Sequence, residues 1–120
     1  MHPKSPKWLQ DILDACELIQ TAIAGRALMD YECDRLLRSA VERNFEIIGE
    51  ALNRIRQNDP ALAERIPENN SIIGFRNLLI HGYDTIDHSR VWEVIQKDVP
   101  KLRLQITQLL KEAGPPPTGD

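Results

Sequence analysis

Apolar residues recur at intervals of three and four along three long stretches of the chain, and this periodicity limits the fold more than any other feature. The spacing places the apolar side chains on one face of an α-helix. No stretch shows the strict alternation that a half-buried strand requires. The sequence therefore predicts an all-α fold, with these three stripes: Trp8, Ile12, Cys16, Ile19 and Ile23; Leu37, Val41, Asn44, Ile48, Ala51 and Ile55; Val91, Ile95, Val99, Leu102, Ile106 and Leu109.

Residues that favour helix ends set the expected boundaries. Ser5 and Pro6 suit the start of a first helix over residues 6–24, which Gly25 ends. Asp30 is the expected N-cap of a second helix that runs to residue 58, and residues 60–66 form a short helical turn.

The remaining boundaries complete a bundle. A third long helix begins between residues 67 and 71 and ends near His81. A last helix over residues 88–113 has Asp87 as its cap and a kink at Pro100. Four long helices with short connections predict a four-to-five-helix up-and-down bundle. Residues 1–113 form this single domain, and the Pro/Gly-rich tail, 114–120, is expected to be disordered.

Composition narrows the classes of function. The chain has 120 residues, a formal net charge of −3 and 5% aromatic residues, which argues against a tight general grip on nucleic acid. Its many arginines still allow a local basic patch. Two distant cysteines suit a reducing compartment. Without an apolar leader or a run of about 20 apolar residues, the chain is expected to be cytoplasmic, with no membrane contact.

The third helix carries polar residues in an apolar run, "GFRNLLIHGYDTID", residues 74–87. Arg76, Asn77, His81 and Tyr83 stand among large apolar side chains, so this helix is expected to lie at the bundle centre or at a dimer interface. On an ideal helix Arg76 and His81 are about 140° apart. They converge only if the helix unwinds near Gly82 or if two copies of the helix meet.

Two features of the second helix have ordinary explanations. Glu42, Glu46 and Glu50 form a row typical of a solvated face with i,i+4 pairing. Asn44 falls within the apolar stripe and is either a hydrogen-bond anchor in the core or part of a site lining.

An arginine and a histidine without a carboxylate cluster suit RNA cleavage, which needs no metal or cofactor. RNA supplies its own nucleophile, the 2′-hydroxyl. Histidine can move a proton near neutral pH, and arginine can bind a phosphate through two hydrogen bonds and stabilise its developing charge. Asn77 could orient His81 or the phosphate. The alternative is a buried structural pair.

The run R-N-L-L-I-H-G-Y, Arg76 to Tyr83, resembles the R-x-x-x-x-H-x-Y signature of HEPN domains in the form carried by HepT-like toxins. The segment "AVERNFEIIGEAL", residues 40–52, is similar to the second helix of that family, and the resemblance extends over about residues 7–112. It implies a helical homodimer whose two signature helices face a shared cleft.

The resemblance also implies an activity and its control. Arg76 and His81 would be the catalytic residues of a metal-independent endoribonuclease, a toxin of a type II/VII-like toxin–antitoxin pair. The antitoxin would be a minimal nucleotidyltransferase that neutralises the toxin by AMPylation of Tyr83.

Three interpretations follow from the sequence. The first is the RNA-cleaving toxin, with Asn77 and Asn44 as supporting residues. The second is a non-enzymatic subunit that presents a cleft and Tyr83 to a partner nucleotidyltransferase. The third is a plain helical dimerisation module. The acidic charge favours the last two, and the intact set of Arg76, His81 and Tyr83 favours the first two.

Overall fold

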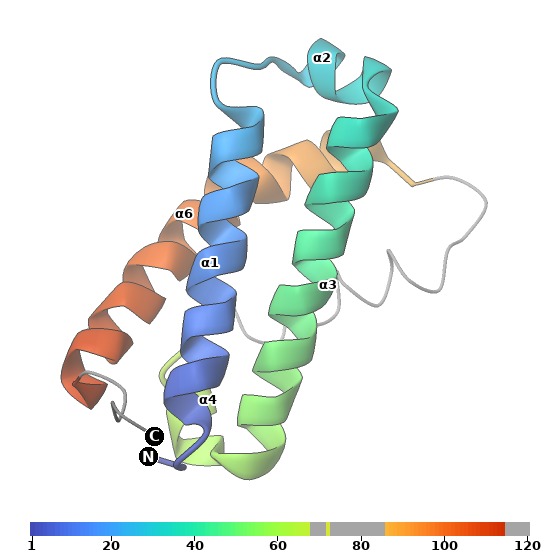
Figure 1. The fold of residues 1–120 in the computed structure, drawn as a ribbon. Coiled ribbons are helices and arrows are strands. Elements are labelled where there is room, and N and C mark those ends of the chain that lie inside the picture. Colours follow the sequence, from blue (N-terminus) through green and yellow to red (C-terminus); the bar gives the residue numbers. More distant parts are fainter. Residues whose placement is uncertain (68–71, 73–85, 115–120) are drawn as a thin grey trace.

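The computed structural model describes residues 1–67, 72 and 86–114. Within these residues the chain forms five helices and no strand: α1 (Ser5–Ile23), α2 (Leu28–Cys33), α3 (Arg35–Asn58), α4 (Pro60–Glu64) and α6 (His88–Ala113). In Figure 1, α1 and α3 run antiparallel, α6 lies behind them, and the short helices α2 and α4 lie at opposite ends of the pair. The prediction of an all-α bundle is confirmed.

The core lies where the apolar stripes of α1, α3 and α6 meet. Every predicted stripe residue of α6 is buried, and so are those of α1 except Ile23, which is half-buried. On α3 the prediction was wrong at one position, because Asn44 is half-buried and the neighbouring Phe45 is fully buried. A phenyl ring fills the interior without the partners that a buried amide would require.

Helix α6 follows its predicted bounds. The Asp87 carboxylate caps it by accepting hydrogen bonds from the backbone N–H groups of Ser89 and Arg90, at 3.0 and 3.3 Å. Pro100 lies inside the helix, and Figure 1 shows the two halves of α6 running in different directions. Such a bend is expected where proline removes a backbone donor and its ring crowds the preceding turn.

The start of α1 differs from the prediction. Lys4, not Ser5, is the N-cap, and Ser5 is fully buried within the first turn. The Ser5 hydroxyl donates a hydrogen bond of 2.8 Å to Asp59 at the junction of α3 and α4. Asp59 also accepts from the His2 backbone N–H at 2.9 Å. The Ser5 hydroxyl, which the sequence predicted to cap α1, therefore binds Asp59, a residue distant along the chain.

The second predicted helix is divided into α2 and α3. Asp34 separates them with an extended backbone and caps α3 by accepting from the Leu37 N–H at 3.1 Å. Asp30, the expected N-cap, instead lies inside α2 and accepts from the Ala27 N–H at 2.8 Å. The predicted end near residue 58 and the short turn of helix after it are confirmed by α3 and α4.

The predicted third helix lies outside the described residues, except for Ile72, which is buried in the core. The expected tail also lies outside them after Gly114. Among the described residues, none of the helices combines the length and apolar character that crossing a membrane would need.

Candidate functional site

The sequence placed four of its five site residues in one segment, and that segment is not described. Arg76, Asn77, His81 and Tyr83 all lie outside the described residues. The fifth, Asn44, is on α3, where its amide nitrogen donates 2.8 Å to the carbonyl of Ala40 in the preceding turn. Its position makes it a half-exposed residue of α3 rather than an anchor in the core.

The described residues on either side of the segment, Ile72 and Ile86, both pack against the core. Ile72 is 1% exposed, and Ile86 packs against the core on the other side of the gap. Asp87 then caps α6. The start of α6 is therefore the described part of the chain that follows the Arg/His segment in sequence.

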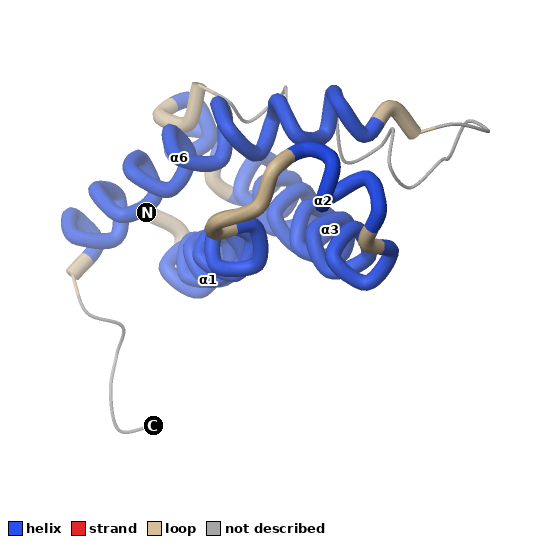
Figure 2. The backbone as a smooth tube through the Cα atoms, turned by 90° about the horizontal axis from the view of Figure 1, so that it is seen from above, coloured by secondary structure: helices blue, strands red, loops and turns tan. Residues whose placement is uncertain are grey.

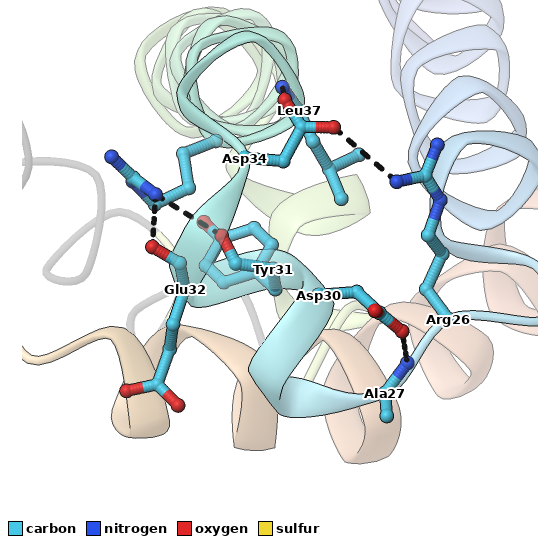
Figure 3. A network of polar contacts seen from close by, with 8 residues as sticks. Arg26, Ala27, Asp30, Tyr31, Glu32, Asp34 and Leu37 are labelled. Carbon is cyan, nitrogen blue, oxygen red and sulfur yellow. Dashed lines mark hydrogen bonds and ion pairs between the residues drawn. The ribbon is translucent and has the colours of Figure 1, made fainter.

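Helix α2 packs against α3 and α6, and polar contacts hold it in position (Figure 3). The guanidinium of Arg38, on α3, donates to the backbone carbonyls of Tyr31 and Glu32, the first at 3.2 Å. Arg26 pairs with Asp34 at 3.3 Å across the other side of α2. Seen from above in Figure 2, α2 lies beside both the start of α3 and α6. These contacts fix a helix of six residues that is too short to be stable alone.

Tyr31 is the side chain that joins α2 to α6. Its ring is fully buried, with its centroid 6.0 Å from the His88 ring in an edge-on contact and 5.6 Å from the Trp92 ring. The Tyr31 hydroxyl and the Nδ1 atom of His88 are both buried without a hydrogen-bond partner in the described structure. Burial raises the pKa of the Tyr31 phenol well above its ordinary value, so the hydroxyl stays protonated.

Glu42 on α3 is a further titratable residue, and its pKa is affected by the charges of His88 and Arg38. It is half-buried on α3, and desolvation raises its pKa, although the nearby charges of His88 and Arg38 act in the opposite direction. Its neighbours in the predicted row form ion pairs: Glu46 with Arg43 at 3.0 Å, and Glu50 with Arg54 at 3.4 Å. Glu42 makes no ion pair or hydrogen bond with another described residue. We call Tyr31, Glu42 and His88 the junction cluster.

A groove of about 430 Å³ lies between α1 and α3 toward the opposite end. Its lining includes Trp8 and five charged residues, but four of these pair with each other on their own helices, Lys7 with Asp11 and Arg54 with Glu50. Paired surface charges give little net attraction for a ligand. The junction cluster is the stronger candidate for chemistry, because the Tyr31 hydroxyl and His88 Nδ1 have no partner among the described residues and Glu42 has a raised pKa.

Comparison with known proteins defines the class. The family model described as "Ribonuclease HepT-like" matches residues 12–109, which include the greater part of α1, all of α3, the Arg/His segment and nearly all of α6. The chain belongs to this family. It is an RNA endonuclease of the HepT-like, HEPN-type class, and the resemblance found in its sequence is confirmed.

Individual relatives agree with this assignment over most of their length. A putative RNase of Caldanaerobacter subterraneus subsp. tengcongensis is 32% identical over 91% of this chain and 97% of its own. A probable ribonuclease HepT of Thermococcus cleftensis is 34% identical over 87% and 94%. A putative RNase of Methanocaldococcus jannaschii is 33% identical over 82% and 90%. No solved structure matches the chain.

Reasoning from the sequence missed the junction cluster. Its three residues come from three helices and are separated by 11 and 46 positions, so no local motif joins them. Glu42 was assigned to a solvated row, and His88 was only the expected first residue of a helix. No spacing signal could have found them, because the tertiary packing of α2 against α6 brings them together.

Proposed function

We propose that this chain is the toxin of a two-gene toxin–antitoxin pair and cleaves RNA without a metal, using Arg76 and His81. The observation that carries the proposal is the match to the ribonuclease family over a range that includes the complete R-x-x-x-x-H-x-Y run. Relatives named as ribonucleases along nearly their whole length support it.

The proposed chemistry uses the substrate's own nucleophile. The 2′-oxygen attacks the adjacent phosphorus, and the bond from phosphorus to the 5′-oxygen breaks. Arg76 binds the phosphate through two hydrogen bonds and stabilises the negative charge that develops on it. His81 transfers a proton at the reacting oxygens. Asn77 and Asn44 have supporting roles in orienting these groups.

The proposed assembly is a homodimer in which both copies of the segment face one composite cleft. Isologous pairing would bring the two Arg/His sets close to one axis. Convergence of Arg76 and His81 across two chains would also overcome their angular separation on one helix. In this proposal a partner nucleotidyltransferase inactivates the toxin by transferring AMP to Tyr83.

The test is cleavage of a fluorescent RNA oligonucleotide by the purified full chain in the presence of EDTA. Arg76→Ala and His81→Ala should each lower the rate by about 10²–10⁴ while leaving the circular dichroism spectrum unchanged. Matched controls are Arg65→Ala, on an exposed arginine that pairs with Glu112, and His2→Ala, on the histidine that stacks on Trp8. Both controls should cleave at the wild-type rate.

Two outcomes would contradict the proposal. Wild-type activity in a folded His81→Ala variant would remove the catalytic assignment. A wild-type protein that cleaves no RNA, yet accepts AMP from the partner, would instead favour the non-enzymatic binding subunit.

A further inference from the structure

The groove of about 430 Å³ between α1 and α3 combines basic, acidic and apolar side chains in one lining. Its volume is in the range of sites that bind small molecules and cofactors. Figure 1 shows the two antiparallel helices that form its walls. Each wall is a row of residues at helical spacing: Lys4, Lys7, Trp8 and Asp11 on α1 and its N-cap, and Ile47, Glu50, Ala51 and Arg54 on α3.

The register of the two helices orders the charges along this groove. The hydrogen bond of 2.8 Å from Ser5 to Asp59 holds the start of α1 beside the end of α3. On both helices the basic lining residues are closer to this bond along the chain than the acidic ones are. The backbone therefore places the basic residues toward one end of the groove and the carboxylates further along it.

The cations of the groove are available to a further anion. Lys7 pairs with Asp11 at 3.0 Å and Arg54 pairs with Glu50 at 3.4 Å, each within one helix and exposed to solvent. Exposed pairs of this kind contribute little free energy, so a phosphate can replace a carboxylate at small cost. Lys4 pairs with no carboxylate among the described residues. The lining thus has three cations and two carboxylates, in a chain whose formal net charge is −3.

We propose that this groove is an accessory RNA-binding site, which holds one nucleotide of a single-stranded substrate away from the bond that is cleaved. The inference deepens the proposed function and rests on it for the choice of RNA. Each class of lining residue matches one part of a nucleotide. The cations bind the phosphate, the carboxylates accept hydrogen bonds from amino groups of the base, and the apolar residues contact the base itself.

Trp8 provides the aromatic surface of this site. Its side chain is 7% exposed and lines the groove, and its indole N–H donates to no described residue. Ile47 and Ala51 of α3 complete the apolar part of the lining. Contact between an aromatic ring and a base tolerates different sequences, because every base has a π-face. This lining favours a nucleotide over a simple anion, which would use the cations alone.

The test measures binding of a short RNA oligonucleotide with methylated 2′-hydroxyls, which lacks the nucleophile for cleavage and stays intact. The groove variant replaces the three lining cations: Lys4→Ala, Lys7→Ala and Arg54→Ala. The matched control removes the same charge from three exposed lysines of α6 that do not line the groove: Lys97→Ala, Lys101→Ala and Lys111→Ala.

The groove variant should bind this RNA about 10–100-fold more weakly than the wild type, and the control should bind at close to the wild-type affinity. The slope of log K against log salt concentration should fall in magnitude by about 0.7 for each groove cation removed. On cleavable RNA the groove variant should have a higher KM and an unchanged kcat, as expected for a contact that is equal in the ground and transition states.

Tryptophan fluorescence tests the location. The chain has two tryptophans, so Trp92→Phe leaves Trp8 as the only one. The intact RNA analogue should quench Trp8 in this variant, and the groove substitutions in the same background should shift the quenching to higher RNA concentrations. An unchanged Trp8 signal at saturating RNA would overturn the proposed location.

The remaining outcomes separate this inference from the proposed function. Equal affinity and equal KM for the groove variant and its control would overturn the inference and leave RNA cleavage intact. Free AMP that binds as tightly as the oligonucleotide would overturn RNA as the ligand. A wild type that binds the analogue through the groove cations but cleaves no RNA would contradict the proposed function and support the binding site.

Discussion

At the scale of single residues, burial distinguishes the three glutamates that form a row on α3. Glu46 and Glu50 each pair with an arginine on α3, at positions where exposed ion pairs are typically worth under about 1 kcal/mol. Glu42 belongs to the same row but is half-buried, and desolvation raises its pKa. A raised carboxyl pKa in the folded state makes its ionised form unfavourable for stability. Replacement by glutamine should therefore leave stability at pH 7 unchanged or higher, as measured by urea unfolding beside Glu46→Gln.

Tyr83 carries a prediction at the same scale. Co-expression with the partner nucleotidyltransferase should add AMP to the wild-type chain, because the phenol offers a nucleophilic oxygen. The added phosphate would place negative charge near the proposed phosphate-binding Arg76 and compete with RNA there. Tyr83→Phe should keep much of the cleavage activity and resist neutralisation by the partner and ATP. Mass spectrometry of the tryptic peptide containing Tyr83 checks the modification.

Tyr31→Phe is the matched control for this experiment, since it removes a phenolic oxygen that is buried in the described structure. That variant should still be AMPylated and silenced. Full silencing of wild-type protein with an unmodified Tyr83 would rule out the mechanism.

At the scale of elements, side chains at helix ends connect the bundle. Asp34, Asp59 and Asp87 cap α3, α4 and α6, each by accepting backbone N–H groups that the helix leaves free. Asp59 does more than cap α4, because it also accepts from the Ser5 hydroxyl and the His2 N–H at the start of α1. The two ends of the α1–α3 pair are thus closed by α2 with its polar contacts and by Asp59.

Asp59→Asn should lower the free energy of unfolding by about 1 kcal/mol at pH 7, because an amide cannot accept all of these hydrogen bonds. Burial alone would raise the pKa of Asp59, but hydrogen bonds from His2, Ser5 and Leu62 together bring it below the ordinary value of 3.8. Stability from the ionised form is therefore complete above pH 3.8 and is lost as the pH falls through the lower folded-state pKa.

Urea unfolding between pH 7 and pH 2 measures this difference. The gap between wild type and Asp59→Asn should close at the acidic end. Asp14→Asn is the control, since the Asp14 carboxylate is exposed and accepts only from Gln10 among the described residues. A gap that is constant across the pH range would show that ionisation of Asp59 does not stabilise the fold.

At the scale of the whole molecule, three long helices share one core, and the chain's Arg/His segment joins α4 to α6. Arg103 of α6 reaches α1 through Gln20 at 2.5 Å and Glu17 at 3.5 Å, so polar contacts reinforce the apolar packing between these helices. Large apolar side chains remain exposed at Leu18, Met29, Leu36 and Leu104. Scattered exposed apolar residues are ordinary on a monomer surface and assign no interface by themselves.

The proposed homodimer is the prediction at this scale. Sedimentation of the full chain at micromolar concentration should give twice the chain mass of 13.7 kDa. Dilution should lower the specific RNA-cleaving activity in parallel with the dimer fraction, because a composite cleft requires both copies. A chain that remains monomeric at micromolar concentration, or whose specific activity is independent of dilution, would contradict the composite cleft.

Apolar periodicity and capping side chains act over a few neighbouring residues, so the positions of the long helices α1, α3 and α6 could largely be predicted from the sequence. It placed α6 and its Asp87 cap correctly and predicted the stripes of the core, since each depends on local geometry. It also identified the family, through a compact run of residues from Arg76 to Tyr83. The roles of those residues stay predictions that rest on the motif.

Partners that are distant along the chain could not be predicted, because they depend on how the helices pack. Ser5 reads locally as a cap, but packing buries it and gives its hydroxyl to Asp59, 54 positions away. Phe45 is buried in the core and its neighbour Asn44 is not, because burying an amide without partners costs more free energy than burying a hydrocarbon ring. Glu42 differs from the rest of its row because partial burial raises its pKa, with the charge of His88 on α6 acting in the opposite direction. The pKa of a side chain depends on the groups that surround it in space, and the spacing of residues along the chain does not specify those groups.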